Sequence, residues 1–226
     1  MNGFEATVWR VETAGRVLAV RLMRRGVPAR EEVEALRLAA RHHQPVPRIV
    51  ATGAIAGCDF IVMSWCDGVT IGDLLVTGGD PEGLGKLLGA AQADLHRPID
   101  ESGSALCHLD FQPFNVRVRD GEVTGIVDWS NARIGDCRDD IAWTQVAFEL
   151  APALLPDLAA DVHAVMTGWR GGYAEHRRLP DDTELSPFLA YAAARQLADW
   201  DERFREDTSL ADVAAAARDI RDRWRG

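Results

Sequence analysis

The chain has 226 residues, of which 47% are hydrophobic and 27% charged, and this composition is typical of an ordered globular protein that needs neither disulfide bonds nor structural metal. Its formal net charge of -10 repels phosphate groups, which argues against nucleic acid as a partner and mildly favours a cationic ligand. No apolar run reaches the roughly 20 residues of a membrane span, the first residues lack the apolar core of a signal peptide, and the four cysteines form no CxxC pair, so we expect a cytoplasmic protein with reduced thiols.

The first third of the sequence predicts a small antiparallel sheet with one helix. Apolar and polar residues alternate at 7–12 and 16–22 around a glycine-containing turn, a pattern that predicts a hairpin. Residues 29–43 place apolar side chains at helical spacing, with acidic residues in the first turns and a proline after the last. Further strands are predicted at 48–52 and 59–65.

The remaining sequence is mainly helical. One apolar stripe begins after Pro81, and several Ala/Leu-rich stretches follow from Val146 onward. The expected fold class is therefore α+β, with an N-terminal lobe at residues 1–66 that holds the antiparallel sheet and a mainly helical C-terminal lobe at residues 67–226.

A second hairpin is predicted where two runs of β-branched residues flank Asp120-Gly121, a pair typical of a type I′ turn. A regular ladder from this turn would pair Asn115 with Ile126 and place Asp128 on the same face as Asn115, one diagonal step along. Diagonal partners have Cα atoms about 7 to 8 Å apart. Amide and carboxylate oxygens are ligands that Mg²⁺ prefers, so this hairpin predicts a magnesium site formed by Asn115 and Asp128.

The segment before this hairpin carries a recognisable motif. It reads HLDFQPFN, from His108 to Asn115, and the hairpin ends in Asp128-Trp129. This pattern resembles the H-x-D-x-x-x-x-N and I-D-W motifs of the aminoglycoside phosphotransferase and choline kinase family, which are related to H-R-D-x-x-x-x-N and D-F-G of protein kinases. The chain is similar to a short member of that family, and the resemblance implies a two-lobed protein-kinase-like fold.

The resemblance also implies roles for the motif residues. Asp110 would be the catalytic base that takes the proton of the acceptor hydroxyl, and Asn115 and Asp128 would hold Mg²⁺ against the phosphates of ATP or GTP. His108 would brace the loop. Phosphoryl transfer needs in-line positioning and neutralised oxygen charge, and these residue types can supply both. Turn capping is the alternative role for Asp110 or Asn115 taken alone.

The next segment, GDCRDDIA, resembles the family pattern G-D-P-x-x-D-L-A. By this resemblance Asp136 and Asp140 would be structural supports of the catalytic loop. Each residue taken singly is more typical of a structural than of a catalytic role.

The nucleotide side of the site differs from the family pattern. The family places a lysine on a strand, paired with a helix glutamate, and here LAVR puts Arg21 in that position with Glu32 on the following helix. Lys86 is the single lysine among 25 basic residues, so the composition itself favours arginine. Arginine can contact phosphates in a bidentate manner, although its geometry is not that of an ammonium. A surface arginine with a solvated glutamate is the alternative.

The contacts to the purine base would come from main-chain groups around Ser64 to Cys66, in a segment that resembles the family's interlobe hinge. The phosphate loop is reduced to the stretch from Gly3 to Thr7, with one glycine, and the first strand of the family's sheet is expected to be missing or short.

The acceptor is expected to be a small molecule with a hydroxyl group, such as an aminoglycoside-like antibiotic, an amino alcohol or a sugar. Few residues separate the helix that ends near His96 from the catalytic loop, which predicts an open acceptor site. Candidate contacts for a cation are aromatic and acidic residues of the C-terminal helices: Trp143, Trp169, Tyr173, Trp200, Asp199, Asp201 and Glu202. A monomer and a homodimer are both open.

Two other functions remain as alternatives. A nucleotide-binding pseudokinase with weak or no transfer activity would explain Arg21 and the short phosphate loop. A metal-dependent hydrolase using His108, Asp110 and Asp128 is less compatible with the sequence, because none of the other histidines clusters with His108. Neither GxSxG nor GxxxxGK[ST] occurs, which argues against a serine hydrolase and a Walker-type nucleotidase.

Overall fold

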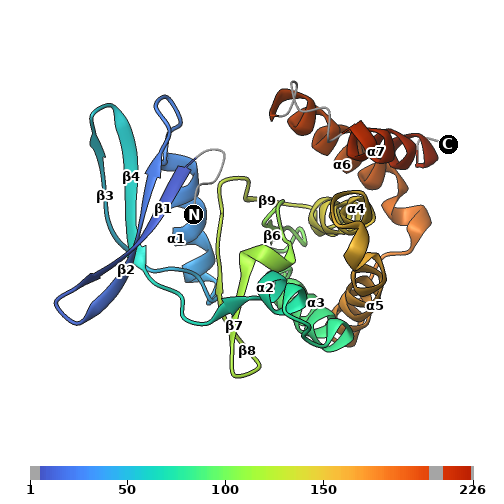
Figure 1. The fold of residues 1–226 in the computed structure, drawn as a ribbon, viewed down its shortest axis with the longest axis horizontal. Helices are drawn as coiled ribbons and strands as arrows, with labels where there is room; N and C mark the ends of the chain where they lie inside the picture. Colours follow the sequence, from blue (N-terminus) through green and yellow to red (C-terminus); the bar gives the residue numbers. More distant parts are fainter. Residues whose placement is uncertain (1–5, 204–210, 225–226) are drawn as a thin grey trace. The chain divides into compact units, whose positions relative to one another are not determined.

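A computed structural model describes residues 6–203 and 211–224, and the chain divides into two units (Figure 1). Unit 1 comprises Met1–Thr70 and Asn115–Ala132, and unit 2 comprises Ile71–Phe114 and Arg133–Gly226. The expected α+β class is confirmed, with a small antiparallel sheet near the N-terminus and predominantly helical structure in unit 2. The lobe boundary between residues 66 and 67 stays a prediction.

Unit 1 is built on a four-stranded antiparallel sheet with the order β1-β2-β4-β3. Its elements are β1 (Ala6–Thr13), β2 (Arg16–Met23), α1 (Arg30–Arg41), β3 (Ile49–Ile55) and β4 (Cys58–Ser64). The hairpin, the helix and the two later strands predicted from the sequence all form. Side chains of β2 alternate, so that Ala19, Arg21 and Met23 share its buried face, and Glu32 lies on the buried face of α1.

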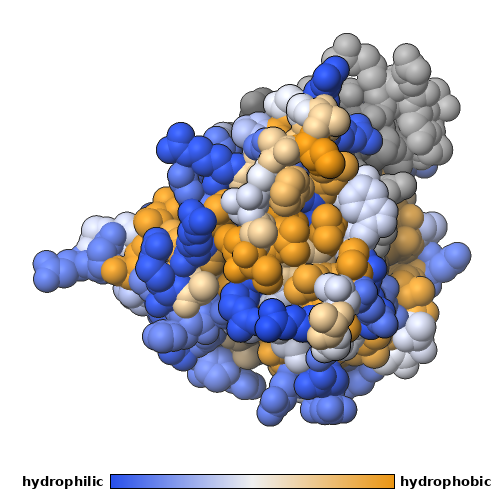
Figure 2. All heavy atoms as spheres, turned by 90° about the vertical axis from the view of Figure 1, so that its left-hand side faces the viewer, coloured by the Kyte–Doolittle hydropathy of each residue, from blue (hydrophilic) through white to orange (hydrophobic). Residues whose placement is uncertain are grey.

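The opposite face of this sheet exposes apolar side chains. Trp9 is 46% exposed, Val50 49% and Ile55 62%. Figure 2, which views the molecule from the side of this sheet, shows apolar side chains among charged ones on that surface. Nothing in the described part of the chain covers these residues.

The second hairpin of unit 1 forms as β7 (Val116–Arg119) and β8 (Glu122–Ile126), with β5 (Val69–Thr70) beside β7. The turn residues Asp120 and Gly121 have φ angles of 54° and 81°. Both values are positive, as a type I′ turn requires, so the predicted turn is confirmed.

The predicted pairing of Asn115 with Ile126 is wrong. Val116 pairs with Ile126 instead, because a bulge leaves Thr124 as an extra residue on β8. The main-chain oxygen of Asn115 accepts a hydrogen bond from the N–H of Val127, at 2.9 Å. A shift of one residue changes which side chains share a face, so the magnesium site cannot be argued from a regular ladder.

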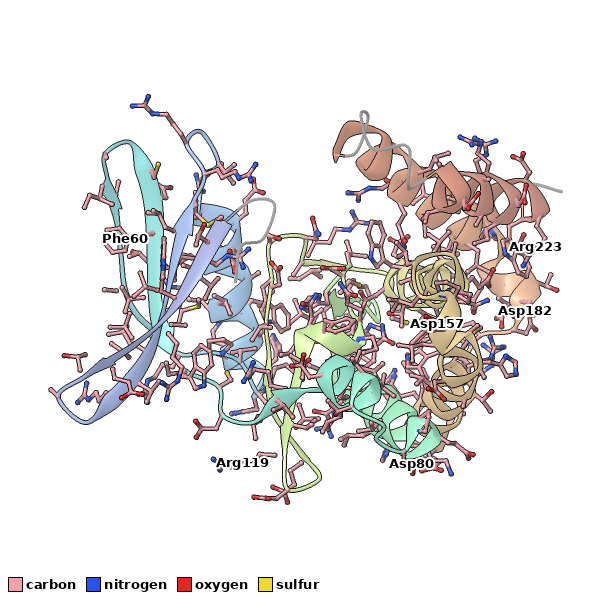
Figure 3. The ribbon with its side chains drawn as sticks, in the orientation of Figure 1. Phe60, Asp80, Arg119, Asp157, Asp182 and Arg223 are labelled. Atoms are coloured by element: carbon pink, nitrogen blue, oxygen red, sulfur yellow. The ribbon has the colours of Figure 1, made fainter. Side chains whose placement is uncertain are left out.

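Unit 2 consists of helices with a two-stranded ladder. Its elements are α2 (Ile71–Val76), α3 (Pro81–Leu95), β6 (Ala105–Cys107), the short turn η1 (Pro113–Asn115) at its border, β9 (Arg133–Gly135), α4 (Cys137–Leu154), η2 (Pro156–Leu158), α5 (Ala159–His176), α6 (Asp182–Arg203) and α7 (Ala211–Arg223). Side chains fill the space between α3, α4 and α5, whereas Asp80 and Arg223 lie on the exterior (Figure 3). Within residues 6–203 and 211–224, no helix combines the length and the apolar character that crossing a membrane requires.

Helices α3 and α5 approach each other at the level of the backbone (Figure 1). A Cβ added at Gly89 would lie 2.1 Å from the main-chain oxygen of Trp169, and one added at Gly172 would lie 2.1 Å from that of Lys86. Glycines are therefore required here for close approach, and this packing fixes the helix that carries His96 at its C-terminal end.

Candidate active site

The loop that carries Asp110 is held by helix α4 on both sides of this residue. Leu109 has a φ of 57°, in the left-handed region that a branched side chain rarely adopts. Its N–H donates to Oδ1 of the buried carboxylate of Asp140, and the hydroxyl of Thr144 donates to the main-chain oxygen of Phe111 at 2.8 Å. The backbone strain at Leu109 is thus offset by contacts from α4, and the half-buried Asp110 has a fixed main chain.

Asp140 belongs to a network of fully buried polar side chains. Its Oδ2 lies 2.8 Å from Nε2 of His96 and accepts a hydrogen bond from Nε2 of Gln92 at 3.1 Å, and Nδ1 of His96 lies 3.0 Å from the hydroxyl of Tyr173. Burial by itself would raise the pKa of Asp140, but the hydrogen bond and the charge of His96, the charge of His108 and the bond from Gln92 together hold this pKa below its usual value. The carboxylate is therefore ionised while it supports the loop.

His96 and Gln92 were not predicted from the sequence. They lie one helical turn apart on α3, whose other buried residues are apolar or glycine. The signal available in the sequence was a pair of polar residues, one helical turn apart, on an otherwise apolar helix face. Because buried polar groups are almost always hydrogen-bonded, such a pair indicates polar partners in the core.

Asp136 begins helix α4. Its Oδ1 accepts a hydrogen bond from the main-chain N–H of Arg138 at 2.9 Å, the geometry of an N-cap, and its carboxylate also meets the Arg138 guanidinium. Hydrogen bonds from the Arg138 side chain are the main cause that lowers the pKa of Asp136. The position of Asp136 supports the start of the helix that holds the loop.

His108 and Gln112 flank Asp110 in the loop. The ring of His108 is fully buried and meets Phe111 edge-on, with 5.9 Å between ring centroids. Nε2 of Gln112 donates to Oδ1 of Asp110 at 3.2 Å. Gln112 was not singled out from the sequence, because it occupies a variable position of the motif.

In unit 1, Arg21 contacts two carboxylates. Its Nε lies 2.9 Å from Oε2 of Glu32, and its Nη2 donates to Oδ1 of Asp128 at 2.9 Å. The side chains of Arg21 and Glu32 are 10% and 3% exposed, so the ion pair implied by the family resemblance is present and largely withdrawn from solvent. The planar guanidinium is the feature that allows one side chain to meet both carboxylates.

Asp128 and Asn115 have the chemistry of magnesium ligands, but two side chains are fewer than a protein-only metal site needs. Ser130 also donates to Oδ1 of Asp128, at 3.2 Å, whereas Oδ2 accepts no hydrogen bond from the described residues. Asn115 is buried. No group of three His, Cys, Asp or Glu side chains able to hold a metal occurs in the described ranges. Mg²⁺ usually takes one or two carboxylates with phosphate and water oxygens, so these two residues fit a metal that arrives with a nucleotide.

The main chain around Ser64 to Cys66 is partly engaged within unit 1. The N–H of Ser64 donates to the oxygen of Arg48 at 2.9 Å, and Nε of Arg117 donates to the oxygen of Cys66 at 2.8 Å. Burial raises the pKa of the Cys66 thiol to about 11, so that it is neutral at physiological pH. Base recognition here would rely on the remaining main-chain groups and on the second lone pair of the Cys66 oxygen.

The predicted acceptor contacts of Trp169 and Tyr173 are wrong. Both side chains are buried in the core, where Nε1 of Trp169 donates to Oε1 of Gln92 at 2.7 Å. Trp143 is 9% exposed and lies beneath the guanidinium of Arg195. The side chains of Trp200, Asp199, Asp201 and Glu202 lie outside the described part of the structure, as do residues Gly3 to Glu5 of the predicted phosphate loop.

Comparisons with known proteins agree with the motif. Residues 2–104 and 97–179, which together span most of the chain, match the model of the phosphotransferase enzyme family. A search of curated protein sequences found no match.

Solved structures share the fold over nearly the full chain. The crystal structure of a thermostable mutant of aminoglycoside phosphotransferase APH(4)-Ia, in ternary complex with ADP and hygromycin B, aligns with a TM-score of 0.71 and 16% identity over 99% of this chain and 91% of that one. An aminoglycoside phosphotransferase from Alicyclobacillus acidocaldarius aligns with a TM-score of 0.60 and 13% identity, over 100% of this chain and 90% of that one. The Plasmodium vivax ethanolamine kinase aligns with a TM-score of 0.63 and 12% identity, over 99% of this chain and 80% of that one.

At these identities the solved structures show the fold alone, and the family assignment rests on the sequence model. The expected resemblance to aminoglycoside phosphotransferases and choline kinases is confirmed, and the chain belongs to the phosphotransferase enzyme family.

Proposed function

We propose that this protein transfers the γ-phosphoryl group of ATP or GTP to a hydroxyl group of a small molecule, with Asp110 as the catalytic base. The observation that carries the proposal is the loop around Asp110, which Asp140 and Thr144 hold at Leu109 and Phe111. A fixed carboxylate suits phosphoryl transfer, in which positioning rather than covalent chemistry is the main contribution of the protein.

In the proposed step, the acceptor oxygen forms a bond to the γ-phosphorus while the bond from this phosphorus to the β,γ-bridging oxygen breaks. The proton of the acceptor hydroxyl goes to Asp110, and the nucleoside diphosphate leaves. The hydrogen bond from Gln112 to Oδ1 of Asp110 helps to orient the carboxylate that would take this proton.

Asn115 and Asp128 are the proposed ligands of Mg²⁺, which when bound would neutralise charge on the phosphate oxygens. Oδ2 of Asp128 is the oxygen available for this role, because Arg21 and Ser130 both use Oδ1. We further assign Arg21, oriented by Glu32, to the nucleotide phosphates.

The other predicted residues complete the proposal. Main-chain groups from Ser64 to Cys66 would contact the purine base of ATP or GTP. His108, Asp136 and Asp140 would be positioning residues that act through the loop and helix α4 rather than on the substrates.

A second candidate function is nucleotide binding without transfer. The contact that favours it is the pairing of Arg21 with Asp128, which engages a proposed metal ligand with a cation of the protein. Contact of Nη2 of Arg21 with the nucleotide phosphates would then require this ion pair to rearrange.

An acceptor screen separates the two candidates. Aminoglycosides, amino alcohols and sugars are incubated with Mg-ATP or Mg-GTP, and nucleotide consumption and product mass are measured. The wild type is expected to phosphorylate at least one acceptor, and Asp110→Asn is expected to lower turnover by about 10²- to 10⁴-fold with nucleotide affinity retained. Asp120→Asn, which removes the same charge from an exposed turn, is the control. Equal turnover in Asp110→Asn and the control would refute the role of Asp110.

A further inference from the structure

The four-stranded sheet of unit 1 is apolar on both of its faces. Its inner face carries Arg21 and packs against α1, whose Glu32 forms the ion pair with this arginine. Cross-strand partners share a face of an antiparallel sheet, so the register of β1, β2, β4 and β3 also defines the outer face. One outer row runs through Trp9, Val20, Val62 and Ala51, and Leu22 and Phe60 lie side by side in the next.

The outer face lacks the polar residues that normally cover the solvent side of an antiparallel sheet. Among the outer positions of the four strands, which all belong to the described range 6–64, Arg16 is the single charged residue. Trp9 is 46% exposed and Ile55 62%, and apolar side chains gather on this side of the molecule (Figure 2). A contiguous exposed apolar patch marks an interaction site on a soluble protein.

Arginines lie at both ends of the outer face. Arg16 begins β2, and Arg48 precedes β3 at the same end, where its N–H donates to Oγ of Ser64 at 2.9 Å. At the other end Arg25 follows β2, and its Nε would lie 3.4 Å from a Cβ added at Gly57, in the turn between β3 and β4. The three arginines are exposed and form no ion pair with a carboxylate of the described chain.

The charge of the chain is divided unequally between the two units. Unit 1 has 11 basic and 10 acidic residues, and unit 2 has 14 basic and 25 acidic ones. The net charge of -10 therefore comes from unit 2, whereas the outer face combines apolar surface with positively charged ends. A complementary partner has an apolar centre and negatively charged ends.

A second copy of the outer face does not match these charges. Two aligned sheets related by a two-fold axis between them bring either the same ends or the opposite ends of the face together. Because both ends carry arginine, the arginines of the two copies would face each other in either arrangement. Like charges that meet across an interface cost affinity.

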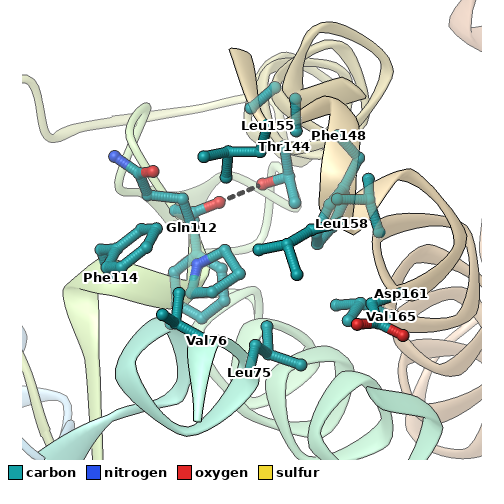
Figure 4. Close-up of a pocket in the computed structure, with 16 residues that line it drawn as sticks. Leu75, Val76, Gln112, Phe114, Thr144, Phe148, Leu155, Leu158, Asp161 and Val165 are labelled. Atoms are coloured by element: carbon teal, nitrogen blue, oxygen red, sulfur yellow. Dashed lines mark hydrogen bonds between the residues drawn. The ribbon is translucent and has the colours of Figure 1, made fainter. Parts of the chain in front are cut away.

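A second apolar surface lies in unit 2, in a pocket between α2, residues 111–114, α4 and α5 (Figure 4). Its volume is about 90 Å³, which holds a side chain or a small molecule but no element of secondary structure. Its lining includes the carboxylate of Asp161 and the 58% exposed side chain of Val76. The open outer face of the sheet, and not this pocket, can therefore hold a whole helix.

We propose that the outer face binds an amphipathic helix of a partner protein, with an apolar stripe in its middle and carboxylates near both ends. Strands are about 4.8 Å apart, so the four strands span about 14 Å, enough for one helix of about 10 Å diameter. The eight residues of β2 extend over about 26 Å, the length of a helix of about 17 residues. Such a helix forms a third layer beside the sheet and α1, with its end carboxylates at Arg16 and Arg48 and at Arg25.

Two synthetic peptides test this surface without nucleotide or acceptor. Both are helices of about 17 residues with leucines along one face. One carries glutamates beside the leucines, and the other carries lysines at the same positions. Calorimetry at low salt should show that the acidic peptide binds at least about tenfold more tightly and that added salt weakens it. Non-specific attraction to a chain of net charge -10 would favour the basic peptide instead. Equal affinities, tighter binding of the basic peptide or no binding of the acidic one would overturn the proposal.

Variants of the two apolar surfaces locate the acidic peptide. Trp9→Glu should weaken its binding about tenfold or more, because large aromatic side chains contribute much of the energy of an interface. Ile55→Glu, at a more exposed position, should act in the same direction if Trp9→Glu lowers the urea midpoint of unfolding. Val76→Glu, which places the same charge at the pocket of unit 2, should leave binding unchanged. Binding that is unchanged in both sheet variants, or that is lost in Val76→Glu, would overturn the proposal.

Charge reversals at the two ends test the complementarity. Arg16→Glu and Arg25→Glu should each weaken the acidic peptide about threefold to fivefold, as surface charge pairs do. Arg37→Glu, at an exposed position of α1 on the other side of the sheet, is the matched control. The same affinity in all three variants would show that the arginine ends do not select the partner, and the proposal would fail.

Two further measurements test the other possible occupants of the outer face. Sedimentation velocity would detect a dimer, and co-sedimentation with vesicles of phosphatidylcholine and phosphatidylglycerol would detect lipid binding. A dimer, or vesicle binding, that Trp9→Glu abolishes and Val76→Glu retains would assign the face to a second copy or to lipid and overturn the helix proposal. Selective binding of the acidic peptide, with neither of these, supports it.

Discussion

Nη2 of Arg21 lies 2.9 Å from Oδ1 of Asp128, while Nε of the same guanidinium lies 2.9 Å from Oε2 of Glu32. One side chain of β2 thus joins a helix carboxylate to the carboxylate that follows the second hairpin of unit 1. A lysine ammonium carries its three N–H donors on a single nitrogen, whereas the guanidinium presents Nε and Nη2 to the two carboxylates from separate positions of one planar group. The arginine at this position therefore has a structural consequence as well as the proposed phosphate contact.

The ion pair of Arg21 and Glu32 should contribute to the stability of unit 1. Replacement of the arginine by methionine leaves the carboxylate of Glu32 without the guanidinium at a position where it is 3% exposed. Because an incompletely compensated buried charge is costly, we expect Arg21→Met to lower the free energy of unfolding in urea by about 3 kcal/mol. The double variant Arg21→Met/Glu32→Gln should recover part of this loss. Identical urea midpoints for the wild type and Arg21→Met would show that the pair does not stabilise the fold.

The proposed magnesium site predicts that the charge of Asp128 controls the metal dependence of nucleotide binding. Asp128→Asn keeps the size of the side chain and removes the charge, and we expect the apparent affinity for Mg²⁺ in the presence of nucleotide to fall at least about tenfold. Asp120→Asn is a matched control on the same hairpin, since asparagine is equally compatible with its type I′ turn. A magnesium titration of nucleotide binding that is the same in both variants would exclude Asp128 as a ligand.

Local patterns predicted most of the elements, and particular long-range contacts were not predictable. The alternation of β2, the spacing of α1 and the Asp120-Gly121 turn depend on neighbouring residues, and each formed as expected. The bulge at Thr124 was not visible, because a β-branched residue is equally typical of a regular strand. One extra residue was enough to change the pairing of Asn115.

The environment of the candidate catalytic loop shows the same limit. The motif identified Asp110 and Asp140, but the sequence did not reveal that Leu109 is in the left-handed region or that Asp140 bonds its N–H. Residues far apart in the chain, such as Tyr173 and His96, become partners only through the packing of α3 against α5. Tyr173 was therefore assigned to the acceptor when it belongs to the core.

The buried network around Asp140 predicts a stability difference that depends on pH. The pKa of Asp140 is lower in the folded chain than its ordinary value, despite burial, because His96, His108, Gln92 and the N–H of Leu109 face the carboxylate. Its ionised form therefore stabilises the fold above the unfolded pKa of about 3.9, and this stabilisation is lost as the pH falls through the folded pKa.

Asp140→Asn should accordingly be less stable than the wild type by about 3 kcal/mol at neutral pH, and the difference should narrow below about pH 4. Urea unfolding at a series of pH values measures both quantities. Asp139, one residue before Asp140 on α4, forms a partly exposed ion pair with Arg133 of β9. Asp139→Asn removes this pair and should lower the free energy of unfolding by no more than about 1 kcal/mol. A difference for Asp140→Asn that stays constant from pH 7 to pH 3 would contradict the assigned ionisation.

The backbone contact between α3 and α5 gives a prediction with two adjacent glycines. A Cβ at Gly172 would lie 2.1 Å from the oxygen and 2.7 Å from the Cα of Lys86, and backbone atoms cannot move aside as a side chain can. A Cβ at Gly171 would meet nothing within 4 Å. Gly172→Ala should therefore destabilise the protein by about 3 kcal/mol, as overpacking does. Gly171→Ala should stabilise it by up to about 1 kcal/mol through helix propensity.

Thermal and urea unfolding of the two variants measure this contrast, since they place the same methyl group one residue apart on one helix. Displacement of α3 in Gly172→Ala would also move His96, which pairs with Asp140, so turnover should fall together with stability. In Gly171→Ala, turnover should stay at the wild-type level. Equal unfolding midpoints in the two variants would contradict the close approach of the α3 and α5 backbones. In that case α4 alone, and not the packing of α3, would support the loop that carries Asp110.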